Sequence, residues 1–171
     1  VVPTPTPSPT RVLNPDNVVI DPTQPAITPL NRIKLWQVSN TGNLLNSYEY
    51  LSPNIISPRK VLISGSNLII VGNLYEKTTT SGFYLSTTKT GAFSPIIKIG
   101  SKNTQINDAI LNADGGLTAV GASGELLLKV KPISKLDAIT LRISNSGSLQ
   151  QVARATLKNT TRSWNSIDAG L

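Results

Sequence analysis

Residues Gly82 to Gly121 read GFYLSTTKTGAFSPIIKIGSKNTQINDAILNADGGLTAVG, the one complete copy of a unit that the rest of the chain repeats in part. Apolar and polar residues alternate on both sides of the turn at Lys89-Thr90-Gly91, and this period of two predicts half-buried β-strands. A second pair of apolar runs flanks another turn at 112–116. Because short glycine-containing turns between such runs are typical of β-hairpins, the stretch predicts four antiparallel strands and no helix.

The same hairpin is predicted three times along the chain. Its turn glycines are Gly42, Gly91 and Gly147, in the contexts SNTGN, TKTGA and SNSGS. The residues four, six and eight positions before each glycine are mostly apolar, whereas those three and five positions before it are mostly polar. The mostly apolar positions hold Val38, Trp36 and Lys34; Thr87, Leu85 and Phe83; and Ile143, Leu141 and Ile139. One face of each hairpin is therefore predicted to be buried.

The repeat has a period of about fifty residues, close to the size of a four-stranded antiparallel sheet. Gly42 and Gly91 are 49 residues apart, as are Gly72 and Gly121, whereas Gly147 follows Gly91 by 56 residues. The seven extra residues of the longer interval fall around 124–134. Alternating apolar residues in that segment predict a lengthened strand or an added β-arm: Leu126, Leu128 and Val130.

Composition divides the chain into a linker and a repeat domain. Residues 1–30 hold eight of the twelve prolines and open with VVPTPTPSPT, a tract that favours extended polyproline II over a helix or a central strand. We expect this segment to be a Pro/Thr/Ser-rich extended linker or stalk, in which only Asn17–Ile20 is apolar enough for an edge strand. Residues 31–171 are predicted to form the β-repeat domain, with units at about 31–81, 82–136 and, in part, 137–171.

The domain resembles the β-propeller repeats of secreted bacterial proteins over about 32–171. The resemblance rests on Asp114-Gly115-Gly116 before an apolar strand that ends in Gly121, on Asp137-Ala138 opening the next strand, and on Asn145-Ser146-Gly147. It implies an all-β fold of antiparallel, four-stranded, propeller-like blades. Closed propellers need roughly four to eight blades, so we expect this array to be incomplete or open. Because an unpaired strand edge invites pairing with another chain, we also expect homo-oligomers, including filaments.

The amino-acid composition narrows the chemistry. Cysteine, histidine and methionine are absent, which removes disulfides, thiolate catalysis and the commonest general base and metal ligand. The formal charge of +7 comes from dispersed Lys and Arg residues, so we expect contact with a cell envelope or anionic glycans rather than specific nucleic-acid binding. No apolar run approaches the roughly 18 residues of a transmembrane segment. Because the sequence starts at Val1, we expect an extracellular or cell-surface protein after removal of a signal peptide.

No residue is predicted to be catalytic, cofactor-binding or metal-binding, and no cofactor is expected. A glycosidase would need two carboxylates across a sugar, but Asp114 and Asp137 occupy turn and strand-start positions, where Asp is favoured for its backbone hydrogen bonds. Ser57–Lys60, Lys89–Gly91 and Ser163–Asn165 match motifs of penicillin-interacting serine enzymes. Their order is wrong, and a proline lies inside the first, so we reject that interpretation.

Two further patterns are predicted to be structural. The segment 112–116 has the look of a calcium loop but lacks the further acidic ligands, so a hairpin turn is expected. Six aromatic residues could line a sugar site: Trp36, Tyr48, Tyr50, Tyr75, Tyr84 and Trp164. For Trp36, Tyr48, Tyr50 and Trp164, the position in the repeat favours packing in the core instead.

The sequence thus predicts a non-enzymatic, extracellular or cell-surface β-repeat subunit with a structural or adhesive role, self-assembling as in a filament or surface layer. The alternative is a fragment of a larger propeller, either a carbohydrate-binding protein or a glycan-active enzyme. In that case further blades would bring carboxylates together at a central cleft.

Overall fold

The protein is an all-β chain of antiparallel sheets. The computed structural model describes residues 12–13, 19–20, 30–155 and 158–168, and every element within these ranges is a strand. The strands are β1 (Val12–Leu13), β2 (Val19–Ile20), β3 (Arg32–Val38), β4 (Leu44–Leu51), β5 (Ile55–Ser64), β6 (Asn67–Glu76), β7 (Thr79–Thr88), β8 (Ile97–Ile99), β9 (Thr104–Leu111), β10 (Leu117–Ser123), β11 (Asp137–Ile143) and β12 (Leu149–Ala155). The predicted all-β, antiparallel architecture is confirmed.

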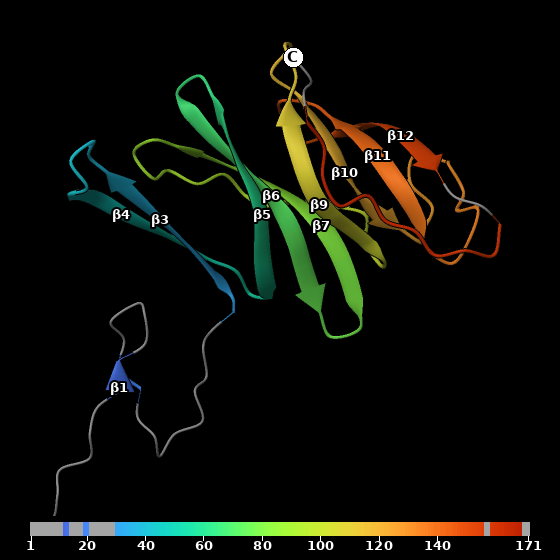
Figure 1. Cartoon of the computed structure of the whole chain (residues 1–171), viewed down its shortest axis with the longest axis horizontal. Coiled ribbons are helices and arrows are strands. Elements are labelled where there is room, and N and C mark those ends of the chain that lie inside the picture. The colour runs from blue at the N-terminus through green and yellow to red at the C-terminus, as the bar shows by residue number, and fades with distance from the viewer. Residues whose placement is uncertain (1–11, 14–18, 21–29, 156–157, 169–171) are drawn as a thin grey trace, which may run out of the picture.

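The strands of the repeat domain form a two-stranded hairpin and two four-stranded sheets. The hairpin is β3–β4, and the larger sheets have the strand orders β5-β6-β7-β8 and β9-β10-β11-β12. Figure 1 shows the three sheets following one another in chain order across the molecule. The described ranges contain no helix long and apolar enough to cross a membrane.

The three predicted hairpins share one register. Val38 pairs with Leu44 across the first turn, and the pairs at the same place in the other two are Thr87–Phe93 and Ile143–Leu149. In each turn the glycine donates its N–H to the carbonyl three residues before it, at 3.0, 3.0 and 2.9 Å. The glycines have φ of +85°, +83° and +85°, a conformation that residues with a Cβ rarely adopt. The sequence repeat therefore corresponds to three hairpin turns with the same strand pairing, the same hydrogen bond and the same φ.

The boundaries of the hydrogen-bonded sheets do not coincide with those of the units predicted from the sequence. The division at 81/82 falls inside β7, whereas the complete sheets run from Ile55 to Ile99 and from Thr104 to Ala155. A periodic pattern has no intrinsic starting point, because alternation and turns define strands but not which strand opens a sheet. In this phase β3–β4 is equivalent to the last two strands of each complete sheet.

Two apolar cores fill the spaces between successive sheets. The core between β3–β4 and β5–β8 contains the buried residues Ile33, Ile56, Ile70, Leu74, Phe83 and Leu85. The core between β5–β8 and β9–β12 includes Ile69, Val71, Tyr84, Ile99, Ile106, Leu117, Ile139, Leu141 and Ile143. The sheet β5–β8 is thus covered on both faces, which is why neighbouring residues on β6, Ile69 and Ile70, are both buried although they point to opposite faces.

The segment 158–168 continues the repeat beyond β12. Thr161 forms a parallel bridge with Leu136, much as Asn103 does with Thr80 one repeat earlier. The backbone N–H of Trp164 donates to the carbonyl of Gly121 at 3.0 Å. This segment therefore lies against β9–β12 as the start of β9 lies against β5–β8.

The apolar piece predicted inside the linker forms a strand with a different partner. Val19 and Ile20 make β2, which pairs with β1 rather than with the edge of a larger sheet. The rest of the predicted stalk lies outside the described residues.

Candidate functional site

The hairpin β3–β4 carries an exposed apolar face. Trp36 and Val38 lie on this face of β3, with Leu44 beside Val38 and Leu51 at the far end of β4. The exposed fractions of these four side chains lie between 53% and 61%. Ile33 and Leu35, which alternate with them along β3, point instead into the core shared with β5–β8. The hairpin is therefore covered on one face only.

The repeat shows what this face is equivalent to. Leu85 and Leu141 occupy the place of Trp36 in the other two hairpins, and both are 0% exposed, whereas Trp36 is 58% exposed. The equivalents of Val38 are likewise buried, Thr87 at 2% and Ile143 at 0%. In both complete sheets these positions face the preceding sheet. The exposed face of β3–β4 is thus the one that a preceding sheet covers elsewhere in the chain.

The turn glycines show the same difference. A Cβ built on Gly91 would lie 2.1 Å from the ring of Tyr48 in the preceding hairpin, and one on Gly147 would lie 2.7 Å from the ring of Tyr84. A Cβ built on Gly42 would meet nothing within 4 Å. Two of the three turns therefore need glycine both for their φ and for close contact with the sheet before them, and the first needs it for φ alone.

Polar contacts join the two complete sheets across their interface. The side-chain amide of Asn73 on β6 donates to the carbonyl of Ile106 on β9 at 3.0 Å and accepts the N–H of Ile106 at 2.8 Å. The hydroxyl of Tyr84 on β7 donates to the carbonyl of Asn145 in the β11–β12 turn, at 2.7 Å. Burial raises the pKa of this hydroxyl above its usual value. Because Tyr84 also packs against Gly147, the tip of the β11–β12 hairpin fits the sheet before it both in shape and in hydrogen bonding.

The outer face of β9–β12 differs from the equivalent face of β5–β8 in side-chain size. Ile69, Tyr84 and Ile97 on β5–β8 contribute to the core with the next sheet. The residues at the same repeat positions on β9–β12 are small and partly exposed: Thr118, Thr140 and Ala153. The outer face of β9–β12 therefore has the same strand arrangement as the face of β5–β8 that packs on the next sheet. Its smaller side chains leave room for larger side chains opposite them.

The carboxylates of the described residues are held apart by separate partners. Asp108 accepts a hydrogen bond from the N–H of Ile167 and lies 3.0 Å from the ammonium group of Lys60. Burial raises the pKa of Asp108, but these partners outweigh it and leave the pKa below the usual value. The pKa of Asp114 is lowered first by the N–H of Gly116 and also by Arg142. No cluster of three metal-ligating side chains occurs in the described part of the chain.

The predicted turn and strand-start roles of Asp are confirmed. The turn at 112–116 joins β9 to β10, with Gly115 at φ +79° and Asp114 accepting the N–H of Gly116 at 3.1 Å. Asp137 opens β11 and accepts the N–H groups of Ile133 and Ser134.

The three segments that match serine-enzyme motifs lie on different elements, although the first and the third both contact β9 through Lys60 and Ser163. Ser57–Lys60 is on β5 at a bulge, Lys89–Gly91 is the β7–β8 turn, and Ser163–Asn165 is in the final segment. The hydroxyl of Ser163 is engaged by the side-chain amide of Asn107 at 2.8 Å.

The core role predicted for the aromatic residues is partly wrong. Tyr50 packs at the first core, where its ring lies 5.5 Å from that of Phe93. Trp36 and Trp164 are instead exposed, at 58% and 45%. Alternation correctly assigned Trp36 to a face that is buried in the other repeats, but it could not show that no sheet of the described residues covers that face here.

Comparison with known proteins leaves the role to be argued from this geometry, since no family model matches the chain and no curated protein matches it.

Proposed function

We propose that the protein is a non-enzymatic, self-assembling β-repeat subunit of an extracellular or cell-surface structure, in which each four-stranded sheet acts as a propeller-like blade. The observation that carries the proposal is the exposure of Trp36 and Val38 at repeat positions that are buried in both other hairpins. Exposed apolar patches of this kind mark interaction surfaces.

The occupant of this face is proposed to be the outer face of β9–β12 from a second copy. The residues directly before β3 are rich in proline, which disfavours central strands, so the proposal takes the covering sheet from a second copy. Among the described residues, the outer face of β9–β12 has no sheet packed on it, and the segment 158–168 lies against this sheet. Trp36 is larger than Leu85 and Leu141, and Thr118 and Thr140 are smaller than Ile69 and Tyr84, so the volumes compensate.

A head-to-tail contact of this kind joins two different surfaces and is heterologous, so it generates either rings or filaments. The repeat domain of each chain supplies three successive sheets, two of them four-stranded, and closed propellers have about four to eight blades. A ring would therefore contain about two copies, and a contact that does not close would build a fibre.

Disulfide trapping between copies tests the proposal cleanly, because the chain has no cysteine of its own. Chains carrying Trp36→Cys and chains carrying Thr140→Cys are mixed and oxidised. The proposal predicts mixed dimers from this pair and ladders from the double variant. The matched control pairs Thr140→Cys with Lys77→Cys, an exposed residue of the β6–β7 turn. Equal cross-linking of both pairs, or linkage of Trp36→Cys only to itself, would contradict the head-to-tail arrangement.

A further inference from the structure

The seven extra residues of the last repeat form a small arm that projects side chains of one character. Leu127 and Val130 pair through two backbone hydrogen bonds of 3.2 and 2.8 Å, with only Leu128 and Lys129 between them. This is an added arm rather than a lengthened strand. Its exposed apolar residues are Leu126, Leu128, Val130 and Ile133, and its exposed cations are Lys129, Lys131 and Lys135.

The tip of the arm is strained. Leu128 has φ +45° and Lys129 has φ +67°, values that two-residue hairpin turns require and that Asn and Gly normally supply. A branched apolar residue and a lysine at these positions cost free energy, and such outliers cluster at functional sites. Leucine and lysine at the tip therefore lower the local stability of the arm.

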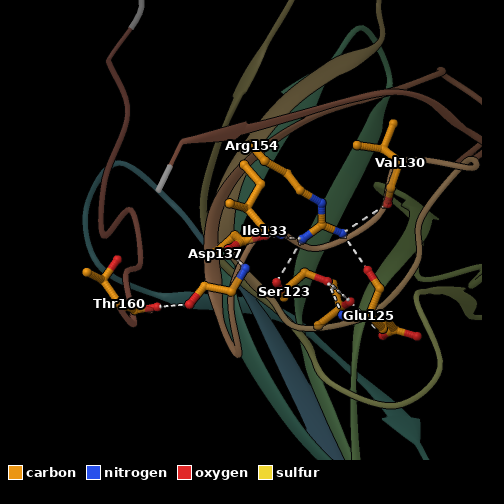
Figure 2. A network of polar contacts seen from close by, with 9 residues as sticks. Ser123, Glu125, Val130, Ile133, Asp137, Arg154 and Thr160 are labelled. Carbon is orange, nitrogen blue, oxygen red and sulfur yellow. Dashed lines mark hydrogen bonds and ion pairs between the residues drawn. The ribbon is translucent and has the colours of Figure 1, made fainter. Parts of the chain in front are cut away.

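A buried ion pair fixes the root of the arm to the sheet. The Arg154 and Asp137 side chains are 2% and 0% exposed and lie 3.1 Å apart. Figure 2 shows the guanidinium group of Arg154 surrounded by the carbonyls of Ser123, Glu125 and Val130, to which it donates hydrogen bonds. Two carbonyls of the arm, those of Glu125 and Val130, are therefore bonded from inside, which fixes the root of the arm to β12.

The acidic groups of this region point inward. The carboxylate of Glu125 accepts the N–H groups of Ser101, Lys102 and Asn103 at 3.0 to 3.1 Å and the hydroxyl of Thr104 at 2.7 Å. Burial raises the pKa of Glu125, but these donors outweigh it and lower the pKa below its usual value. The charges of Glu125 and Asp137 are thus stabilised by partners inside the fold, and the charged side chains that the arm exposes are cations.

More cations lie beside the arm on the final segment. The hydroxyl of Ser134 donates to the carbonyl of Thr160, and the N–H of Arg162 donates to the carbonyl of Leu136 at 3.0 Å. These contacts bring the exposed residues Lys158 and Arg162 to the same end of the sheet. The field around the four apolar side chains is therefore positive.

We infer that this arm, residues 124–136, docks on an anionic lipid surface. The arm's exposed aliphatic side chains match the acyl boundary of such a bilayer, and its exposed lysines match the headgroups. The internal hydrogen bonds to the carbonyls of Glu125, Leu127 and Val130 fit entry into the interface, where an unsatisfied backbone group is costly. An anionic glycan would use the cations and leave the four aliphatic groups without a role. The inference stands on residues other than those of the assembly face.

The test is sedimentation of the full chain with vesicles of phosphatidylcholine alone or with about a third phosphatidylglycerol, at low and high salt. Binding is expected only to the anionic vesicles, weakening as salt rises. Leu128→Gly is the informative variant, because glycine suits the turn and removes the aliphatic group. We expect it to unfold at an unchanged or higher denaturant concentration and to bind about tenfold more weakly. Lys129→Gly should likewise keep the fold and lose several-fold in binding.

The matched control is Ile63→Ser, which removes an aliphatic side chain with 67% exposure on β5 and should bind like the wild type. Equal binding to neutral and anionic vesicles, or no binding to either, would overturn the inference. Full binding by Leu128→Gly would do so too, because charge alone would then suffice. A change of mass in Leu128→Gly without vesicles would assign the arm to contact between copies, and would also overturn it.

Discussion

The hairpins β3–β4 and β11–β12 have the same turn, the same pairing register and opposite surroundings. Gly42 and Gly147 have the same φ of +85°, yet only Gly147 touches a neighbouring sheet. Leu141 is buried and Trp36, at the same repeat position, is exposed. Local sequence therefore determines the hairpin, and the neighbouring sheet determines which of its residues become core.

Charged residues show the same contrast at one repeat position. Glu49 on β4 makes an exposed ion pair with Arg32, at 3.1 Å. Arg154 takes the equivalent place on β12 and is buried in its pair with Asp137. An exposed ion pair contributes little to stability. Breaking a buried pair leaves the remaining charge buried without a partner, which lowers stability.

The largest expected effect comes from this pair of positions. Arg154→Met should lower the free energy of unfolding by about 3–5 kcal/mol, because Asp137 would stay buried without its cation. Glu49→Gln should change it by less than about 1 kcal/mol. Urea unfolding of both variants checks the contrast, and similar losses would show that the two environments do not differ as described.

The second prediction compares the two apolar positions. Leu141→Ala should destabilise the chain by about 2–5 kcal/mol through loss of buried contacts and the cavity left behind. Trp36→Ala should change stability by no more than about 0.5 kcal/mol in dilute solution, where its face is uncovered. A loss for Trp36→Ala as large as that for Leu141→Ala would mean that Trp36 is already core in the single chain.

The turn glycines Gly42 and Gly91 have nearly the same φ, but only Gly91 is in close contact with the preceding sheet. Gly42→Ala should cost about 1–2 kcal/mol, the strain of a left-handed alanine. Gly91→Ala has the same φ strain and in addition drives a methyl group into the ring of Tyr48, which should add about 1–3 kcal/mol. Denaturant midpoints of the two variants measure the difference, and equal midpoints would contradict stacking of β7–β8 on β3–β4.

The smallest effect is expected in the pH dependence. The pKa of Glu125 is lowered in the folded chain, so its hydrogen bonds stabilise the fold above the usual value of about 4.5. This contribution is lost as pH falls below that value and through the lower folded pKa, because protonation then opposes folding. Glu125→Gln should flatten this acid limb of a stability-against-pH curve. An unchanged acid limb in the variant would assign the loss to other carboxylates.

Sequence alone predicts the strands and the turns well, because both depend on local chemistry. Alternation located the hairpins, and the glycines at 42, 91 and 147 marked turns that need positive φ. The phase of the sheets did not follow from the sequence, since a hydrogen-bonded edge depends on which strands find a partner.

The candidate surfaces were less accessible to sequence reasoning. Trp36 is exposed because no sheet lies against it in the described part of the chain, and no pattern around residue 36 records this. The arm left one usable signal, seven extra residues with alternating aliphatic groups and lysines. Its anchor was not predictable, because Arg154 takes a place that Lys98 and Glu49 hold in the other repeats, and all three look like surface residues.

The central claim is that the exposed face of β3–β4 receives a sheet from a second copy, and sedimentation equilibrium of the wild type and Trp36→Lys tests it most directly. Ile63→Lys, on an exposed site of another strand, serves as the control. The proposal predicts that the wild type and the control form species that are multiples of 18.2 kDa as concentration rises, while Trp36→Lys stays at 18.2 kDa. A wild type that remains at 18.2 kDa throughout, or a Trp36→Lys variant that assembles like the control, would contradict it.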